Sequence, residues 1–110
     1  MDKPWGHEEI WAETDMYVGK TLVIRQGHRL SLQHHELKDE TLRVASGELE
    51  LLLEDEAGAM VTHIMGPGDI ARIRPRRRHR LRARSTVEVI EVSTPHLDDV
   101  VRHDDDYGRA

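Results

Sequence analysis

The sequence predicts an all-β fold, a sandwich or barrel of many short strands, and three observations support this class. Apolar and polar residues alternate with a period of two in TLRVAS (41–46), ELELLLE (48–54) and TVEVIEVS (86–93). Turn-forming residues separate such runs, among them Gly27, Ser46-Gly47 and GPGD at 66–69. No stretch before Pro95 keeps a helical period over three turns. Short alternating runs between turn signals are typical of β-sandwiches and barrels.

The composition predicts one modest domain. A chain of 110 residues is long enough for a single core, so we expect one domain over residues 1–110. Phe is absent, so the core must come from Leu, Val, Ile and Met, with Trp5 and Trp11 as the largest side chains. Cysteine is absent, and no long apolar run or signal-like segment is visible. We therefore expect a cytoplasmic protein with no membrane partner.

The individual elements follow in chain order. TLVIR at 21–25 is β-branched and apolar, which predicts the first core strand. SLQHH at 31–35 predicts a strand with Ser31, Gln33 and His35 on one face and with Leu32 and His34 on the other. The three alternating runs predict the next strands. After Pro95, HLDDVVRHDD predicts a short C-terminal helix or tail, with apolar residues at 97, 100 and 101 on one helical face.

Four polar residues are candidates for one site. Glu40 lies five residues after His35, so a bend or bulge in ELKDE is needed to return it to the face of Gln33 and His35. His79 shares its strand face with Leu81 and Ala83, which predicts that it points inward. His34 lies on the opposite strand face from Gln33 and His35, and we interpret it as a non-ligand. Spacing alone leaves open whether Gln33, His35, Glu40 and His79 bind a metal or are ordinary hydrogen-bonded residues.

A resemblance to a known family rests on the motifs that contain these residues. Gly27, Gln33, His35, Glu40 and Gly47 have the spacing of the first cupin motif, with Gln in place of its first histidine. The segment from Gly68 to His79 resembles the second motif. Gln in this position, together with KPWG (3–6), YVGK (17–20) and VVRHDDDYGR (100–109), is similar to the cupin domain of type II mannose-6-phosphate isomerases. The resemblance covers nearly the whole chain and implies a double-stranded β-helix, the cupin jelly-roll barrel.

The resemblance also implies a metal site with a defined ligand set. Its ligands would be Gln33, His35, Glu40 and His79, which would hold one divalent ion per chain. Imidazole and carboxylate ligands suit Zn, Mn, Fe, Co or Ni. Such a site, with open coordination positions, favours a small-molecule ligand that is anionic or rich in oxygen.

The sequence departs from the family pattern at two positions and in its domain content. Arg76 stands where the second motif has a turn Gly, which leaves the conformation of the loop at 74–78 open. Lys38 stands where family members with isomerase activity usually carry Arg, and Lys lacks the bidentate fork that grips phosphate. The nucleotidyltransferase domain of larger family members is absent from this sequence.

Eight of the thirteen arginines lie between Arg72 and Arg84, a pattern that can indicate nucleic-acid binding. A period of two, however, places Arg78, Arg80, Arg82 and Arg84 on one strand face, opposite His79, Leu81 and Ala83. We interpret the run as a solvated basic face or a partner for the acidic tail, and the loop arginines could also steer an anionic substrate. Because no aromatic platform for bases accompanies it, we expect no nucleic-acid partner.

Three functions stay open on the sequence. The first is a metal-dependent isomerase of a sugar phosphate, with Lys38 or a metal-bound hydroxide as the candidate base. The second is a dioxygenase or lyase cupin, and the third is a binding protein without turnover. Lys38, Arg78, Tyr107 and Arg109 are candidate substrate-binding residues, although the YGR segment could also be a packing clamp. Small cupins commonly pair, so we expect a homodimer in which KPWGHEEIWAE adds a strand across a two-fold interface.

Overall fold

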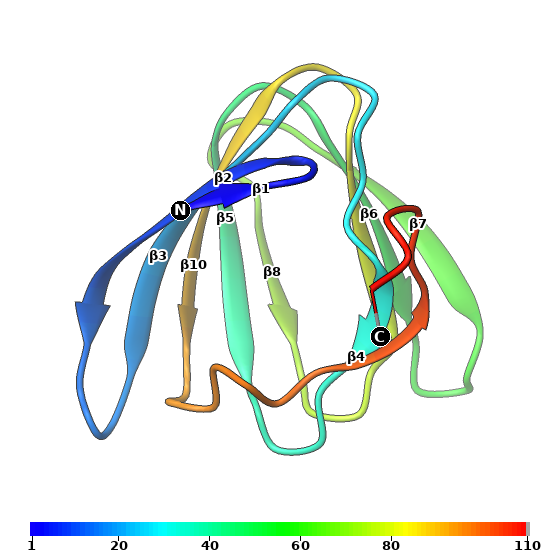
Figure 1. Cartoon of the computed structure of the whole chain (residues 1–110). Helices are drawn as coiled ribbons and strands as arrows, with labels where there is room; N and C mark the ends of the chain where they lie inside the picture. The colour runs from blue at the N-terminus through cyan, green and yellow to red at the C-terminus, as the bar shows by residue number, and fades with distance from the viewer. Residues whose placement is uncertain (110) are drawn as a thin grey trace.

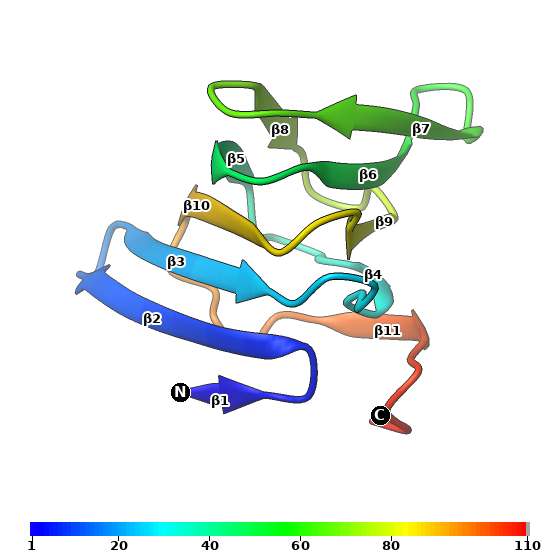
Figure 2. The ribbon, with the colours of Figure 1, turned by 90° about the horizontal axis from the view of Figure 1, so that it is seen from above.

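A computed structural model describes residues 1–109, which form two antiparallel sheets that face each other (Figure 1). The first sheet contains, in spatial order, β1 (Asp2–Lys3), β2 (Gly6–Glu13), β3 (Val18–Ile24), β10 (Val87–Ser93), β5 (Glu40–Ser46) and β8 (Ile70–Ile73). The second contains β11 (Val101–Asp104), β4 (Leu32–His34), β9 (His79–Ala83), β6 (Leu49–Glu54) and β7 (Met60–Met65). This is the predicted all-β jelly-roll barrel, and Figure 2 shows its two layers from above.

The core lies between the sheets because one face of each strand is apolar. In β10 the inward residues Val87 and Val89 are fully buried, and they alternate with the outward residues Glu88 and Ile90. The inner faces of β5 and β6 follow the same pattern, with a period of two. The largest fully buried apolar side chains are Ile24, Leu42, Leu49, Leu51, Ile73, Val18, Val44, Val87 and Val89. The strands expected at 21–25, 41–46, 48–54 and 86–93 are all present to within a few residues.

Of the predicted C-terminal helix or tail, only the helix is wrong: residues 96–104 contain no helix and end in a strand. The chain after β10 crosses the lower end of the barrel and joins the opposite sheet as β11, antiparallel to β4 (Figure 1). The helical pattern rested on three apolar residues only, and the β-branched pair Val100-Val101 also suits a strand. The edge of β4 supplies the backbone partners, with Val101 opposite His34 and Arg102 opposite Gln33. Pairing with an open sheet edge therefore replaces a helix that had little apolar surface to bury.

The N-terminal segment has a place in the barrel that the sequence did not reveal. Trp5 is only 3% exposed and belongs to the core cluster, whereas Trp11 is 51% exposed. Trp11 lies over Gly19 on the outer face and donates its indole N–H to the Thr21 hydroxyl at 3.1 Å. β2 pairs with β3 of its own chain. The homodimer through this segment stays a prediction, which light scattering at micromolar concentration can test.

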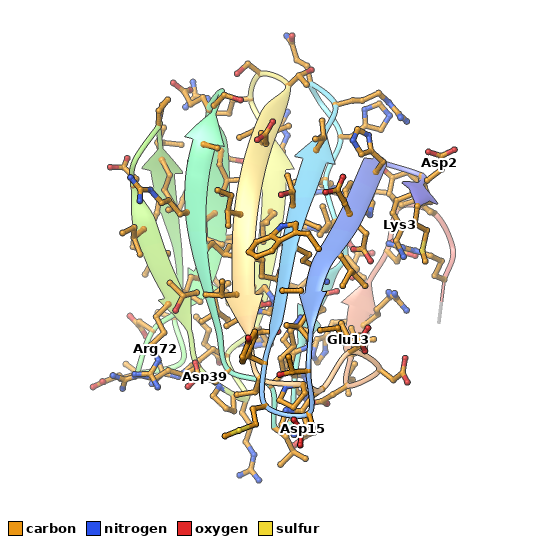
Figure 3. All side chains as sticks on the ribbon, turned by 90° about the vertical axis from the view of Figure 1, so that its left-hand side faces the viewer. Asp2, Lys3, Glu13, Asp15, Asp39 and Arg72 are labelled. Atoms are coloured by element: carbon orange, nitrogen blue, oxygen red, sulfur yellow. The ribbon has the colours of Figure 1, made fainter. Side chains whose placement is uncertain are left out.

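The arginine run is largely neutralised within the chain. Figure 3 shows Arg72 and Asp39 side by side, and their ion pair measures 2.6 Å. The outward arginines pair with acids in or next to β6 and in the C-terminal segment: Arg78–Glu54, Arg80–Asp104, Arg82–Glu50 and Arg84–Glu48. Arg80 is only 8% exposed and pairs with Asp104, so at that position the run is a partner of the acidic tail and not a solvated face. The segments ELELLLE and RHRLRAR are thus complementary partners in one sheet. Within residues 1–109, no helix is long and apolar enough to cross a membrane.

Candidate metal centre and its cavity

His35, Glu40 and His79 meet inside the barrel from three different segments of the chain. His35 directly follows β4, Glu40 begins β5 and His79 begins β9. A bend at residues 36–37 turns the chain from one sheet to the other, as the sequence requires if Glu40 is to reach the His35 side. The three side chains are 4%, 3% and 1% exposed. One potential ligand atom from each lies within 4.8 Å of the others, the spacing of a single ion's ligands.

The histidines face one carboxylate oxygen. Glu40 Oε1 lies 3.2 Å from His79 Nε2 and 3.5 Å from His35 Nε2, and the two imidazole centroids are 5.1 Å apart. Burial by itself raises the pKa of Glu40. The close approach of both histidines and the charge of Lys38 outweigh burial and hold this pKa well below its usual range. Glu40 is therefore ionised at neutral pH, as a metal ligand must be.

The other nitrogen of each histidine is anchored to the backbone. His35 Nδ1 lies 2.5 Å from the Asp99 carbonyl oxygen, and His79 Nδ1 lies 2.9 Å from the Arg77 carbonyl oxygen. A carbonyl only accepts, so each Nδ1 carries the proton and each Nε2 is left with its lone pair. Among the described residues, neither His35 Nε2 nor His79 Nε2 has a hydrogen-bond partner, and both atoms face Glu40 Oε1. Two buried orphan nitrogens beside a buried carboxylate are costly without a ligand, and this set of atoms fits a divalent cation.

Gln33 and His34 lie where the strand phase places them. Gln33 is the cross-strand neighbour of His79 and borders the same cavity as His35. Its Oε1 accepts a hydrogen bond from the Ser31 hydroxyl at 2.7 Å and keeps a second lone pair. His34 points elsewhere, with its ring nitrogens 2.7 Å from His103 and 2.7 Å from Glu36. Gln33 thus lies on the same side as His35 and His79, and its role as a fourth ligand stays a prediction, whereas His34 points away.

The loop before His79 keeps a turn that usually needs glycine. Arg76 has a φ of +67°, in the left-handed region that L-residues with a side chain seldom adopt. The conformation persists because the Arg76 amide donates to the His35 carbonyl at 2.6 Å, which ties this loop to the loop after β4. The side chain makes only an exposed contact with Glu36 at 3.4 Å. The substitution of Arg for Gly therefore keeps the loop geometry and adds backbone strain.

Asp99 supports the centre from the segment that crosses the lower end of the barrel. Its carboxylate accepts three backbone hydrogen bonds, from Glu36, Leu37 and Lys38, at 2.7–3.0 Å. Partial burial raises the pKa of Asp99, but these donors prevail and lower it to about 2. The carbonyl of the same residue holds His35. One residue thus fixes both the loop between β4 and β5 and the orientation of a candidate ligand.

A polar cavity of about 140 Å³ adjoins the candidate metal centre formed by His35, Glu40 and His79. It lies between the N-terminal strands and the segment around β11, and it reaches the centre at Gln33, His35 and Lys38. Its lining contains five basic side chains and two acidic ones, which gives a formal charge of +3: Lys3, Lys20, Lys38, Arg102 and Arg109 against Glu8 and Glu91. An excess of cations in a concave site favours anionic ligands.

Lys38 bridges two buried carboxylates at the inner end of this cavity. Its Nζ lies 3.1 Å from Glu40 Oε2 and 3.0 Å from Glu91 Oε2. Burial lowers the pKa of Lys38, but the charges of Glu91 and Glu40 more than offset this and raise it to about 12. Lys38 is therefore protonated at neutral pH. This charge argues against Lys38 as a proton-accepting base and favours a role as a fixed cation.

The three other candidate substrate residues occupy different places. Arg78 forms two hydrogen bonds with Glu54 and does not line the cavity, which argues against a role in substrate binding. Tyr107 packs against the core cluster, which favours a packing role over a role in substrate binding. Arg109 lines the cavity, is bound to Asp105 at 3.0 Å and lies 5.6 Å from the Tyr107 ring centre. Of the three, only Arg109 is placed to meet a ligand.

Sequence reasoning missed two residues that shape the site, Glu91 and Asp99. Glu91 carried a usable signal, because it has the same strand phase as Val87 and Val89 and a charge on a buried face is unusual. The sequence contained no comparable signal for Asp99, because Asp99 stands among other acids in a segment whose path was predicted incorrectly.

Comparisons with known proteins agree with the fold. The sequence model of the cupin domain matches residues 20–93. No curated protein matches the chain. The structure is similar to KdgF from Halomonas sp., with 24% identity, a TM-score of 0.71, and coverage of 80% of this chain and 76% of that one. It is also similar to an uncharacterised double-stranded β-helix protein from Klebsiella pneumoniae, with 18% identity, a TM-score of 0.76 and coverage of 93% and 87%.

Oxalate decarboxylase from Bacillus subtilis is a third similar structure, with 16% identity and a TM-score of 0.73. The match covers 81% of this chain and 24% of that enzyme, which has Mn(II) centres. At such identities these likenesses establish the fold, and the chemistry must be argued from the site itself.

Proposed function

Because the chain belongs to the cupin family, we propose that it is a metal-dependent enzyme that acts on an anionic, oxygen-rich small molecule. Sugar-phosphate isomerisation of the mannose-6-phosphate type is the leading reaction. The observation that carries the proposal is the buried set of His35, Glu40 and His79, in which two unpaired histidine nitrogens face Glu40 next to a cavity rich in basic side chains.

The proposed ligands are His35, Glu40 and His79, with Gln33 as the fourth. Two neutral imidazoles, one neutral amide and one carboxylate would leave a divalent ion with a net charge near +1, suited to Zn, Mn, Fe, Co or Ni. When bound, such an ion polarises a substrate carbonyl and stabilises the negative charge that develops on its oxygen.

The residues of the cavity supply binding and orientation. Lys38, next to the centre, is positioned to stabilise an oxyanion on the substrate. Lys20 and Arg109 lie among the basic side chains further along the lining, where they would attract a phosphate or carboxylate. A substrate with a carbonyl at one end and an anionic group at the other matches this distribution of charge.

The test is a coupled assay for conversion of mannose 6-phosphate to fructose 6-phosphate, with Mn, Zn, Co and Ni supplied in turn. We expect turnover with at least one metal, loss of turnover in His79→Ala, and retention in His34→Ala as the matched control. Absence of turnover with every metal, together with oxygen uptake on a diketone or catechol, would favour an oxygen-using cupin. Saturable ligand binding without any turnover would favour a binding protein.

A further inference from the structure

Glu91 is a buried carboxylate that the ligand set leaves unused. It lies on the inward face of β10, is 5% exposed and borders the cavity beside Lys38. Its Oε2 lies 3.0 Å from Lys38 Nζ and 3.5 Å from Lys20 Nζ. A buried charge is costly, and the core positions Val87 and Val89 on the same face show that this strand can pack apolar residues.

We propose that Glu91 is the catalytic base that carries the substrate proton, an inference that rests on the proposed isomerase function. The step balances without an oxidant or a co-reactant. Glu91 takes the proton from C2 of the aldose, the C2–H electron pair forms the C1=C2 double bond, and the C1 carbonyl oxygen gains the negative charge. Glu91 then returns its proton to C1, while the O2 hydroxyl proton passes to O1 and the C2 carbonyl forms.

Three other titratable groups in the cavity or next to it are less suited to this task. Glu40 is committed to the two histidines, at 3.2 and 3.5 Å. Lys38 is held protonated between two carboxylates. Glu8 lies at the far end of the ion-pair chain, 3.5 Å from Lys20. Among these carboxylates, Glu91 combines a position next to Lys38 with freedom from the ligand set.

The surroundings also adjust the basicity of Glu91. Burial raises the pKa of Glu91 and the nearby charge of Glu40 raises it further, while Lys38 and Lys20 oppose the shift. A carboxylate whose pKa is above its usual range is a stronger base, as proton abstraction next to a carbonyl requires. The two lysines hold the carboxylate in one orientation.

The test compares Glu91→Gln with Glu91→Asp and with Glu88→Gln, a matched control on the exposed face of the same strand. For Glu91→Gln we expect kcat for mannose 6-phosphate to fall by about 10²- to 10⁴-fold with little change in KM. Deuterium from D₂O should no longer enter the sugar carbon. Metal content, and calorimetric binding of glucitol 6-phosphate, which lacks the carbonyl, should be retained. Glu91→Asp should keep measurable exchange, and Glu88→Gln should match the unmodified protein.

The outcomes separate the two proposals. If the unmodified protein isomerises the sugar and Glu91→Gln keeps its rate and its deuterium exchange, Glu91 is not the base and the isomerase proposal survives. If Glu91→Gln and Glu91→Asp both lose metal and unfold at lower temperature in step with activity, Glu91 is part of a structural ion-pair network only. If the unmodified protein binds metal but isomerises nothing, the proposed function fails, and the assignment of Glu91 fails with it.

Discussion

The two ends of the barrel interior are built on the same strands but filled in opposite ways. On β5 the inward residues change from Glu40 to Leu42 and Val44, and on β10 they change from Val89 to Glu91. All of these side chains are at most 5% exposed. The end that contains Leu42, Val44 and Val89, here called the apolar end, is stabilised by burial alone. The charged end loses hydration, and its ion pairs and anchored histidines offset this loss. The apolar end therefore stabilises the fold, whereas the charged end carries groups that the stability of the fold does not require.

Leu42→Ala should have the largest effect at the apolar end. Leu42 is fully buried, so its truncation leaves a cavity and should lower the free energy of unfolding by about 2–5 kcal/mol. Urea unfolding measures the loss, and elemental analysis should show unchanged metal per folded chain. Arg43→Ala, an exposed neighbour on β5, should change stability by less than about 0.5 kcal/mol. A loss of metal in folded Leu42→Ala would contradict the separation of the two ends.

Metal removal should test the charged end. If a divalent ion is bound at about 100 times its dissociation constant, a chelator should lower stability by about 2.7 kcal/mol and lower the melting temperature. His35→Ala and His79→Ala should contain no metal and should not respond to the chelator. His34→Ala should respond like the unmodified protein, because His34 faces His103 and Glu36. The opposite result for His34 and His35 would show that the ligand assignment is wrong.

Asp99→Asn should lower the free energy of unfolding by weakening the hydrogen bonds that hold the loop between β4 and β5. The carboxylate accepts three backbone hydrogen bonds, and the loss of its charge should cost about 1–3 kcal/mol. Because folding lowers the pKa of Asp99 from 3.8 to about 2, its contribution is present above about pH 4 and is lost as the pH falls toward 2. Urea unfolding at about pH 6 and about pH 3 should therefore show a smaller difference between variant and unmodified protein at the lower pH. Asp98→Asn, an exposed neighbour, should show no such trend.

Arg76→Gly should have the smallest effect, and it should be stabilising. Glycine removes the strain of a positive φ, worth about 1–2 kcal/mol, and costs about 0.5–1 kcal/mol in backbone entropy. The lost contact with Glu36 is exposed and contributes little. We expect a net gain of about 0.5–1 kcal/mol in urea unfolding. Arg77→Gly, at a position without a positive φ, should be destabilising, and a gain there would refute the strain argument.

The sequence by itself determined the strands of the apolar end. Period-two alternation in 41–46, 48–54 and 86–93 reports which face is buried, because successive side chains on a strand point in opposite directions. The same rule placed His79 with Leu81 on the inner face and separated His35 from His34, as the structure has them. These are local properties, which a single strand already contains.

Tertiary structure alone decided how the charged end is assembled. The C-terminal segment joined β4 as a strand because an unpaired sheet edge was available, and that path brought the Asp99 carbonyl to His35. Arg76 adopted a positive φ because its amide meets the His35 carbonyl across two loops. Glu91 became a partner of Lys38 only when β10 and β5 paired. Contacts between segments far apart in the chain depend on pairing and packing, and no local pattern of residues records them.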